Sequence, residues 1–119
     1  MADLDRDGGV DVLAMEIGSL TMEAAVLAFR GRGDGTFEEP LRVPVEIFQP
    51  ASLIVSDLDG RGYLEILAAG WGSRELTLIP GEIGGLGAPG SIPLAGLPWA
   101  LAVDDLDADG DPDVAVAIQ

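Results

Sequence analysis

Residues 105–113 read DLDADGDPD and residues 3–11 read DLDRDGGVD, so both follow the pattern D-x-D-x-D-G-x-x-D. Oxygen ligands at alternate positions of a tight loop converge on one point, and the glycine permits the sharp reversal of the chain. Without a cation, carboxylates crowded in this way would repel one another strongly. A hard cation that takes about six to eight oxygen ligands, calcium above all, suits the pattern. We therefore predict a calcium site in each loop.

The candidate ligands are the odd-numbered positions of each loop. The alternative, which stays open, is an acidic turn exposed to solvent. An EF-hand begins in the same way, but it closes with a bidentate Glu at position twelve between two helices. That position holds Ala14 or Val116 here, inside strand-like sequence, which excludes the helical version. The predicted metal ligands are Asp3, Asp5, Asp7, Gly9 and Asp11 in the first loop and Asp105, Asp107, Asp109, Asp111 and Asp113 in the last.

A third loop, residues 57–65 (DLDGRGYLE), departs from the pattern because Arg61 replaces the third Asp. In one interpretation the site has decayed and Arg61 points to solvent. In the other, which we favour, the guanidinium lies among Asp57, Asp59 and Glu65 and supplies the positive charge that calcium gives elsewhere. Binding of three calcium ions per chain would contradict both interpretations.

The loops belong to a repeat. Residues 50–59 align with residues 98–107, with six of ten positions identical, and a further copy of the loop begins at Asp3. A period of about 50 residues is typical of propeller blades. We predict one domain, 1–119, divided into a partial blade unit (1–49), a full blade unit (50–97) and a partial blade unit (98–119).

A full unit is expected to form a four-stranded antiparallel sheet. The first unit is expected to lack its first strand and the third to end after its second, which gives an all-β fold of about nine strands, or just over two blades per chain. In the middle unit the predicted strands are 51–56, 63–69, 75–80 and 91–95. The first two are apolar runs, as strands buried on both faces should be. The segment 84–90 is rich in glycine and is expected to be a loop. Residues 10–29 are ambiguous between helix and strand.

Composition excludes several functions. The net charge of −15 disfavours nucleic acid and anionic membranes as partners. The chain has neither Cys nor His, so thiolate and imidazole metal sites and Ser-His-Asp catalysis are impossible. No stretch approaches the roughly 18 apolar residues of a membrane helix. The N-terminal residues also lack the features of a signal peptide.

These motifs resemble the FG-GAP/VCBS repeat family, the blades of integrin-α-like β-propellers. The likeness rests on the acidic loops, on the Pro-x-x-Leu-x-Val run before them, and on residues 33–37 (GDGTF), with residues 87–89 (GAP) as a remnant. It implies calcium between the first and second strands of a blade. It also implies adhesion, carbohydrate binding or protein contact, usually outside the cell or at its surface. Arg61 and the missing hairpin motif of the second repeat depart from the family pattern.

Just over two blades cannot close a propeller, which needs about four or more. We therefore expect a homo-oligomer in which the strand near 99–104 pairs with the first unit of a neighbouring chain. Three chains would supply about six blades and four chains about eight. The alternative is a truncated piece held by other contacts.

The leading functional hypothesis is a calcium-stiffened interaction or adhesion scaffold. Trp71 is the candidate contact to a protein or glycan ligand, with packing between blades as its alternative. Trp99 is expected in the core, and the remaining aromatic residues in core or hairpin packing. A lectin-like propeller and a purely structural, self-assembling repeat are the alternatives. An enzyme with paired carboxylates is disfavoured, because the metal loops already account for these carboxylates.

Overall fold

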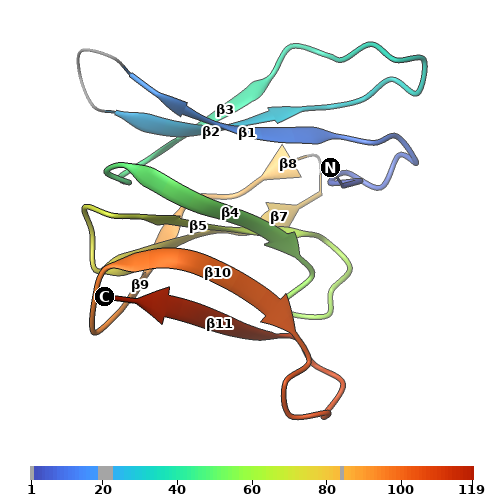
Figure 1. Ribbon diagram of the computed structural model, residues 1–119. Coiled ribbons are helices and arrows are strands. Elements are labelled where there is room, and N and C mark those ends of the chain that lie inside the picture. The colour runs from blue at the N-terminus through green and yellow to red at the C-terminus, as the bar shows by residue number, and fades with distance from the viewer. Residues whose placement is uncertain (1, 19–22, 84) are drawn as a thin grey trace.

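The computed structural model describes residues 2–18, 23–83 and 85–119, and in this part of the chain every regular element is a strand (Figure 1). Three antiparallel sheets follow one another along the chain and stack side by side. The first has the order β1-β2-β3, the middle one β4-β5-β6-β9 and the last β10-β11. The all-β blade architecture predicted from the sequence is confirmed.

The strand bounds follow the hydrophobic runs. The first sheet contains β1 (Val12–Ile17), β2 (Ala24–Phe29) and β3 (Leu41–Val45). The middle sheet contains β4 (Pro50–Ser56), β5 (Glu65–Gly70), β6 (Glu75–Ile79) and β9 (Gly90–Pro93). The last sheet contains β10 (Pro98–Asp104) and β11 (Asp113–Ile118), and a small separate hairpin contains β7 (Gly81–Glu82) and β8 (Gly85–Leu86). The three main sheets lie within 1–49, 50–97 and 98–119, although the division into units stays a prediction.

The repeat seen in the sequence is also visible in the strand pairing. β4 pairs with β5 and β10 pairs with β11, each antiparallel with an irregularity just after its first proline, Pro50 or Pro98. Chain segments of similar sequence therefore adopt the same pairing and the same local irregularity.

The middle sheet is buried on both faces at its second strand, β5, which explains the uninterrupted apolar sequence of that strand. All six residues of β5 are buried. Ile66 and Ala68 face the first sheet, in a core with Val26 and Val45. On the opposite face, Leu67 packs against three side chains of the last sheet, Leu101, Val103 and Val116.

The structure corrects three details of the sequence prediction. The ambiguous stretch 10–29 contains β1 and β2, with residues 19–22 outside the described part. The strand predicted at 63–69 begins only at Glu65, because the acidic loop continues through Tyr63. The glycine-rich segment was expected to be a loop, but Gly85 and Leu86 pair with Glu82 and Gly81 as β8 and β7; residue 84 lies outside the described residues.

Trp99, which was expected in the core, is 55% exposed, so that prediction is wrong. It lies on β10 where the pairing with β11 is irregular, in a two-stranded sheet that has neighbours on one face only. Phe48 is also exposed. Phe37 is partly exposed but packs edge-on against Phe29, with ring centroids 6.5 Å apart, as expected of a hairpin contact.

Within the described residues, no helix long and apolar enough to cross a membrane was found.

Candidate metal centres

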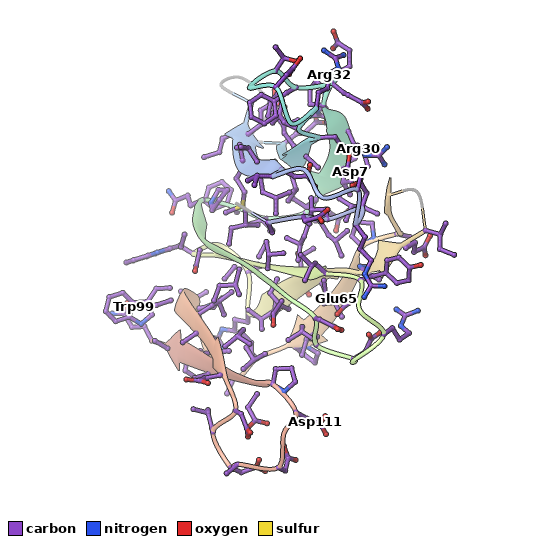
Figure 2. The ribbon with its side chains drawn as sticks, turned by 90° about the vertical axis from the view of Figure 1, so that its right-hand side faces the viewer. Asp7, Arg30, Arg32, Glu65, Trp99 and Asp111 are labelled. Carbon is purple, nitrogen blue, oxygen red and sulfur yellow. The ribbon has the colours of Figure 1, made fainter. Side chains whose placement is uncertain are left out.

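The three acidic loops lie on the same side of the molecule, at the right in Figure 1. The middle loop joins β4 to β5, the last joins β10 to β11, and the first leads into β1. Figure 2 views this side directly, with Asp7 in the first loop, Glu65 at the end of the middle loop and Asp111 in the last. The stacking of the sheets therefore sets the loops in a row.

All three loops share one backbone conformation. Position four has a positive φ in each of them, at Arg6 (64°), Gly60 (73°) and Ala108 (62°). Position six, always glycine, is also left-handed, with φ between 85° and 93° at Gly8, Gly62 and Gly110. The reversal that the motif predicts thus takes place at two points, and only the second of them is reserved for glycine.

The carboxylates are held by backbone N–H groups in the same way in each loop. The acid at position nine accepts a bond from the N–H of position two: Leu4 to Asp11 (2.7 Å), Leu58 to Glu65 (2.7 Å) and Leu106 to Asp113 (2.9 Å). The acid at position one accepts from the glycine at position six: Gly8 to Asp3 (3.1 Å), Gly62 to Asp57 (2.8 Å) and Gly110 to Asp105 (2.9 Å). The middle loop differs in sequence but keeps these two hydrogen bonds, which we call the hydrogen-bond frame of the loop.

This frame brings positions one, three and nine together. In each loop one oxygen from each of the three acids lies within 4.8 Å of the others. We call these sets the acidic triads; they are Asp3, Asp5 and Asp11; Asp57, Asp59 and Glu65; and Asp105, Asp107 and Asp113. Oxygen-only clusters of this kind match the ligand preference of calcium and magnesium.

Asp7 and Asp109, the predicted ligands at position five, are not members of the triads. The Asp7 carboxylate accepts a hydrogen bond from the N–H of Gly9 at 2.6 Å, and the Asp109 carboxylate accepts one from the N–H of Asp111 at 2.9 Å. Both aspartates therefore form short local turns within their own loops. The structure thus brings together six of the ten ligands predicted for the first and last loops.

Two of the triads contain buried oxygens without a hydrogen-bond partner. These atoms are Asp3 Oδ1 in the first loop, and Asp57 Oδ1 and Glu65 Oε1 in the middle loop. A buried carboxylate oxygen without a partner is unfavourable. A cation coordinated at the triad would give such oxygens the contact they lack, so the donor set and its geometry fit a hard divalent ion.

Arg61 forms an ion pair with one acid of the middle loop, Asp59, and interacts with Glu65 through charge, whereas the interpretation favoured from the sequence placed its guanidinium among all three acids. Its Nε contacts Asp59 Oδ2, and its side chain is 58% exposed. No ion pair joins it to Asp57 or Glu65 in the described part of the chain. Hydrogen bonds from Arg61, first from its backbone N–H, lower the pKa of Asp59.

The first loop is flanked by a cation from the segment that directly follows β2. Arg30 Nε lies 3.5 Å from Asp5 Oδ2. Burial raises the pKa of Asp5, as do the neighbouring charges of Asp7 and Asp11, whereas Arg30 and the backbone N–H of Asp7 act in the opposite direction. A carboxyl in this position is one whose charged form a bound cation would stabilise.

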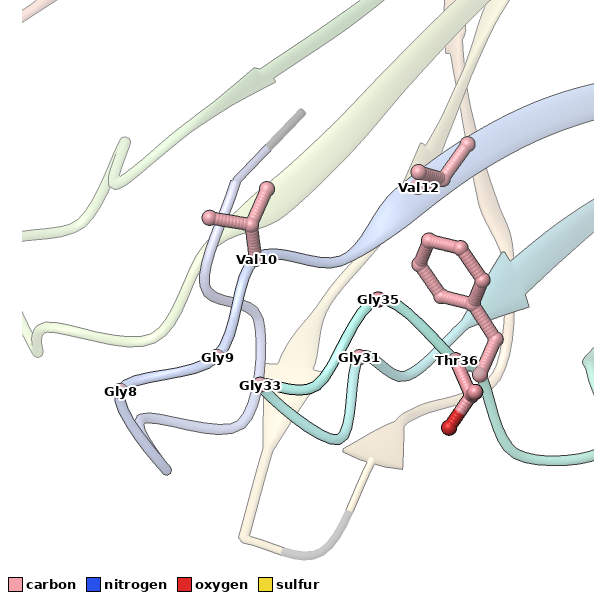
Figure 3. A pocket seen from close by; sticks show the side chains of 9 residues that line it. Gly8, Gly9, Val10, Val12, Gly31, Gly33, Gly35 and Thr36 are labelled. Atoms are coloured by element: carbon pink, nitrogen blue, oxygen red, sulfur yellow. The ribbon is translucent and has the colours of Figure 1, made fainter.

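Two further features, a contact between two loops and a cavity, were not apparent from the sequence. The Arg6 guanidinium lies over the ring of Tyr63 and links the first loop to the middle one. A cavity of about 420 Å³ separates the first loop from the GDGTF hairpin and is lined by Val10, Val12 and Phe37, with several glycines (Figure 3). The GDGTF motif at residues 33–37 was the only sequence signal for this cavity, and it predicted the hairpin without its contact to the first loop.

Trp71 lies at the opposite end of β5 from the triad, in the turn that follows the strand, and is 48% exposed. It lines a cavity of about 320 Å³ together with Trp99, Ile118 and Gln119. Figure 2 shows Trp99 projecting from the side of the molecule. The second tryptophan of this cavity was missed because its place at the start of an apolar strand indicated burial.

Stacked antiparallel blades with repeated acidic loops define a propeller-like repeat scaffold. Comparison with family models gives the same result: the FG-GAP-like repeat matches residues 3–68 and again residues 57–116. The chain therefore belongs to the FG-GAP-like repeat family, a family of scaffolds. Comparisons with curated proteins and with solved structures found no match.

Proposed function

We propose that the chain is a calcium-stiffened blade scaffold, outside the cell or on its surface, which presents its loops and edges to a binding partner and does not itself catalyse a reaction. The observation that carries the proposal is the identical construction of the three acidic triads, with buried oxygens left unpartnered in two of them. Acidic turns that are exposed to solvent and bind no ion would not be expected to share the same backbone hydrogen bonds in three loops. The extracellular location rests on the family and on the abundance of calcium outside cells.

Within each loop the protein supplies a preformed set of acceptors. Backbone N–H groups fix the acids at positions one and nine before any ion arrives, so little side-chain entropy remains to be lost on binding. Calcium would neutralise the mutual repulsion of the acids. It would also tie the loop to the first residue of the following strand, Glu65 in β5 and Asp113 in β11. Each ion would thereby stiffen the turn between two strands of a blade.

Calcium-dependent stability tests this function. Thermal unfolding of the full chain is measured in calcium, in magnesium and with a chelator. We expect Tm to rise with calcium concentration, because an ion that binds only the folded state shifts the equilibrium by mass action. Magnesium should have a smaller effect, since it demands near-octahedral geometry and keeps several of its water ligands. A Tm that is the same in calcium and in chelator would contradict the proposal.

The cavity between Trp71 and Trp99 supports a second role, the binding of a protein or glycan ligand. Two half-exposed indole rings at one cavity offer the flat apolar faces on which sugar rings and partner side chains pack. A glycan array probed with the native chain and with Trp71→Ala separates the possibilities. A signal lost in the variant supports a lectin-like site, and no signal on any glycan leaves a protein ligand as the surviving candidate.

We also propose that the chain associates with itself. The outward face of the last sheet carries two directly paired sets of alanines, Ala100 with Ala117 and Ala102 with Ala115, and all four are exposed. The equivalent face of the middle sheet is covered by β10 and β11. Light scattering with and without chelator tests this. An assembly that binds no further ligand would favour the purely structural role, and a monomer at micromolar concentration would contradict self-association.

A further inference from the structure

The middle loop lacks the third aspartate, yet its triad is complete. Arg61 stands at position five, and the aspartates at that position in the other loops, Asp7 and Asp109, lie outside the triads. The substitution therefore removes none of the three acids that converge. One oxygen from each of Asp57, Asp59 and Glu65 lies within 4.8 Å of the others, and the same limit holds in the two intact loops.

Glu65 provides an acceptor that its counterpart in the first loop lacks. Both oxygens of Asp11 are occupied, one by the N–H of Leu4 and the other by the N–H of Gly31 at 2.9 Å. Glu65 is only 4% exposed and uses Oε2 to accept from Leu58, which leaves Oε1 buried without a partner. Glu65 therefore keeps one buried oxygen that no hydrogen bond occupies.

Asp57 adds a second oxygen of the same kind. Its Oδ2 accepts from the N–H of Gly62, and its Oδ1 is buried without a partner. Arg61 donates a hydrogen bond to neither atom, because its guanidinium contacts Asp59 and interacts with Glu65 through charge alone. Two buried carboxylate oxygens without a hydrogen-bond partner, on two acids of one triad, are unfavourable unless a cation contacts them.

Building on the calcium-binding function proposed above, we propose that Asp57, Asp59 and Glu65 form a third calcium site, with Glu65 Oε1 and Asp57 Oδ1 among the ligands. The glutamate at position nine compensates for the aspartate missing at position five. Arg61 remains at the rim, where its charge weakens the affinity for the ion without replacing it.

Calcium stoichiometry tests this site. Equilibrium dialysis of the full chain with calcium alone is compared for the native protein, Glu65→Gln and Asp107→Asn. We expect three ions for the native chain and two for each variant. A native value of two that Glu65→Gln leaves unchanged would overturn the third site. Failure of the last loop to bind is a separate outcome, because Asp107→Asn would then change nothing while Glu65→Gln still removed one ion.

Arg61→Gln gives an independent measurement that does not alter the triad. With a calcium site in the middle loop, the variant still binds three ions, and the middle site binds roughly threefold to tenfold more tightly because a nearby like charge is gone. If the arginine instead takes the place of the ion, the native chain binds two and the variant binds three. That second result would overturn the proposal even if Glu65→Gln failed to fold.

Discussion

The guanidinium carbon of Arg6 lies 5.4 Å from the centroid of the Tyr63 ring, so the first acidic loop contacts the middle one directly. Arg6 is the residue at position four of its loop and has a positive φ of 64°. The loops are therefore connected to one another as well as aligned.

Gly62, beside Tyr63, leaves the room that this contact needs. A Cβ at position 62 would lie 1.9 Å from a guanidinium nitrogen of Arg6. Gly62→Ala should therefore displace Arg6 and also force alanine into a φ of 85°, which costs ~1–2 kcal/mol by itself. The lost cation–π contact adds ~0.5–1 kcal/mol at an exposed site. Chemical denaturation measures the sum.

Gly60→Ala is the matched control, because Gly60 also has a positive φ but would place its Cβ in open space. It should lose the backbone contribution alone. In the background of Arg6→Ala, the two glycine variants should become equally destabilised. A difference that persists without the arginine would show that Gly62 acts through some other contact.

Asp107 and Asp109 should differ in their effect on calcium-dependent stability. Asp107 belongs to the triad of the last loop, whereas Asp109 accepts a local hydrogen bond from Asp111. An ion at 100 times its Kd stabilises the folded state by ~2.7 kcal/mol. Asp107→Asn should remove most of this gain and Asp109→Asn a smaller part. The comparison is made by unfolding each variant with calcium and with chelator.

The alternate spacing of aspartates was sufficient to predict where the acidic loops lie and that the acids at positions one, three and nine come together. It was not sufficient to predict that the acid at position five is not a member of the triad. Asp7 and Asp3 are equivalent in a pattern of letters, but Asp7 accepts from the N–H of Gly9 and Asp3 from that of Gly8. Which acid faces the triad depends on the backbone φ values at positions four and six, and these do not appear in the motif.

Apolar runs predicted the strands well, since burial on both faces leaves a continuous hydrophobic signal in β5. The same signal gave a wrong prediction for Trp99. An apolar strand indicates that burial of its side chains would be favourable, but it does not show whether another part of the chain covers them. The contact between Arg6 and Tyr63 could not be predicted from the sequence either. It joins two blades, and its geometry depends on how they stack.

The hairpin at residues 33–37 should report on the protonation of Asp34. The hydroxyl of Thr36 and its backbone N–H both donate to Asp34 Oδ1, at 2.6 and 2.8 Å, and both lower the pKa of Asp34 below its usual value. A lowered pKa means that the stabilisation is present above the unfolded value of about 3.8 and is lost as the pH falls through the folded pKa. An NMR titration of the carboxyl carbon measures this directly.

Thr36→Val removes the hydroxyl and keeps the backbone donor. The pKa of Asp34 should move back toward its ordinary value in this variant but not reach it. The equivalent change at Thr77, which is buried in β6, should leave the Asp34 titration where it was. An unchanged Asp34 pKa in Thr36→Val would mean that the hydroxyl does not hold the carboxylate in solution.

Gly31 and Gly81 occupy equivalent places after β2 and β6, and both should be hard to replace. A Cβ at Gly31 would lie 2.2 Å from the carbonyl oxygen of Val10, and one at Gly81 would lie 2.5 Å from that of Leu64. Both clashes are with backbone, which cannot rotate away. Overpacking of this kind costs ~1–3 kcal/mol.

Gly31→Ala should be the more damaging of the two, because the N–H of Gly31 also donates to the buried Asp11. Moving that donor leaves a buried carboxylate oxygen without its partner, at a further ~1–3 kcal/mol. Gly90→Ala is the control, since its Cβ would meet nothing within 4 Å. Denaturant unfolding should rank the stability losses as Gly31 above Gly81 above Gly90. A Gly31 variant as stable as the Gly90 variant would mean that the first loop does not pack against β2 in solution, and the frame that holds Asp11 in its triad would then lack its second support.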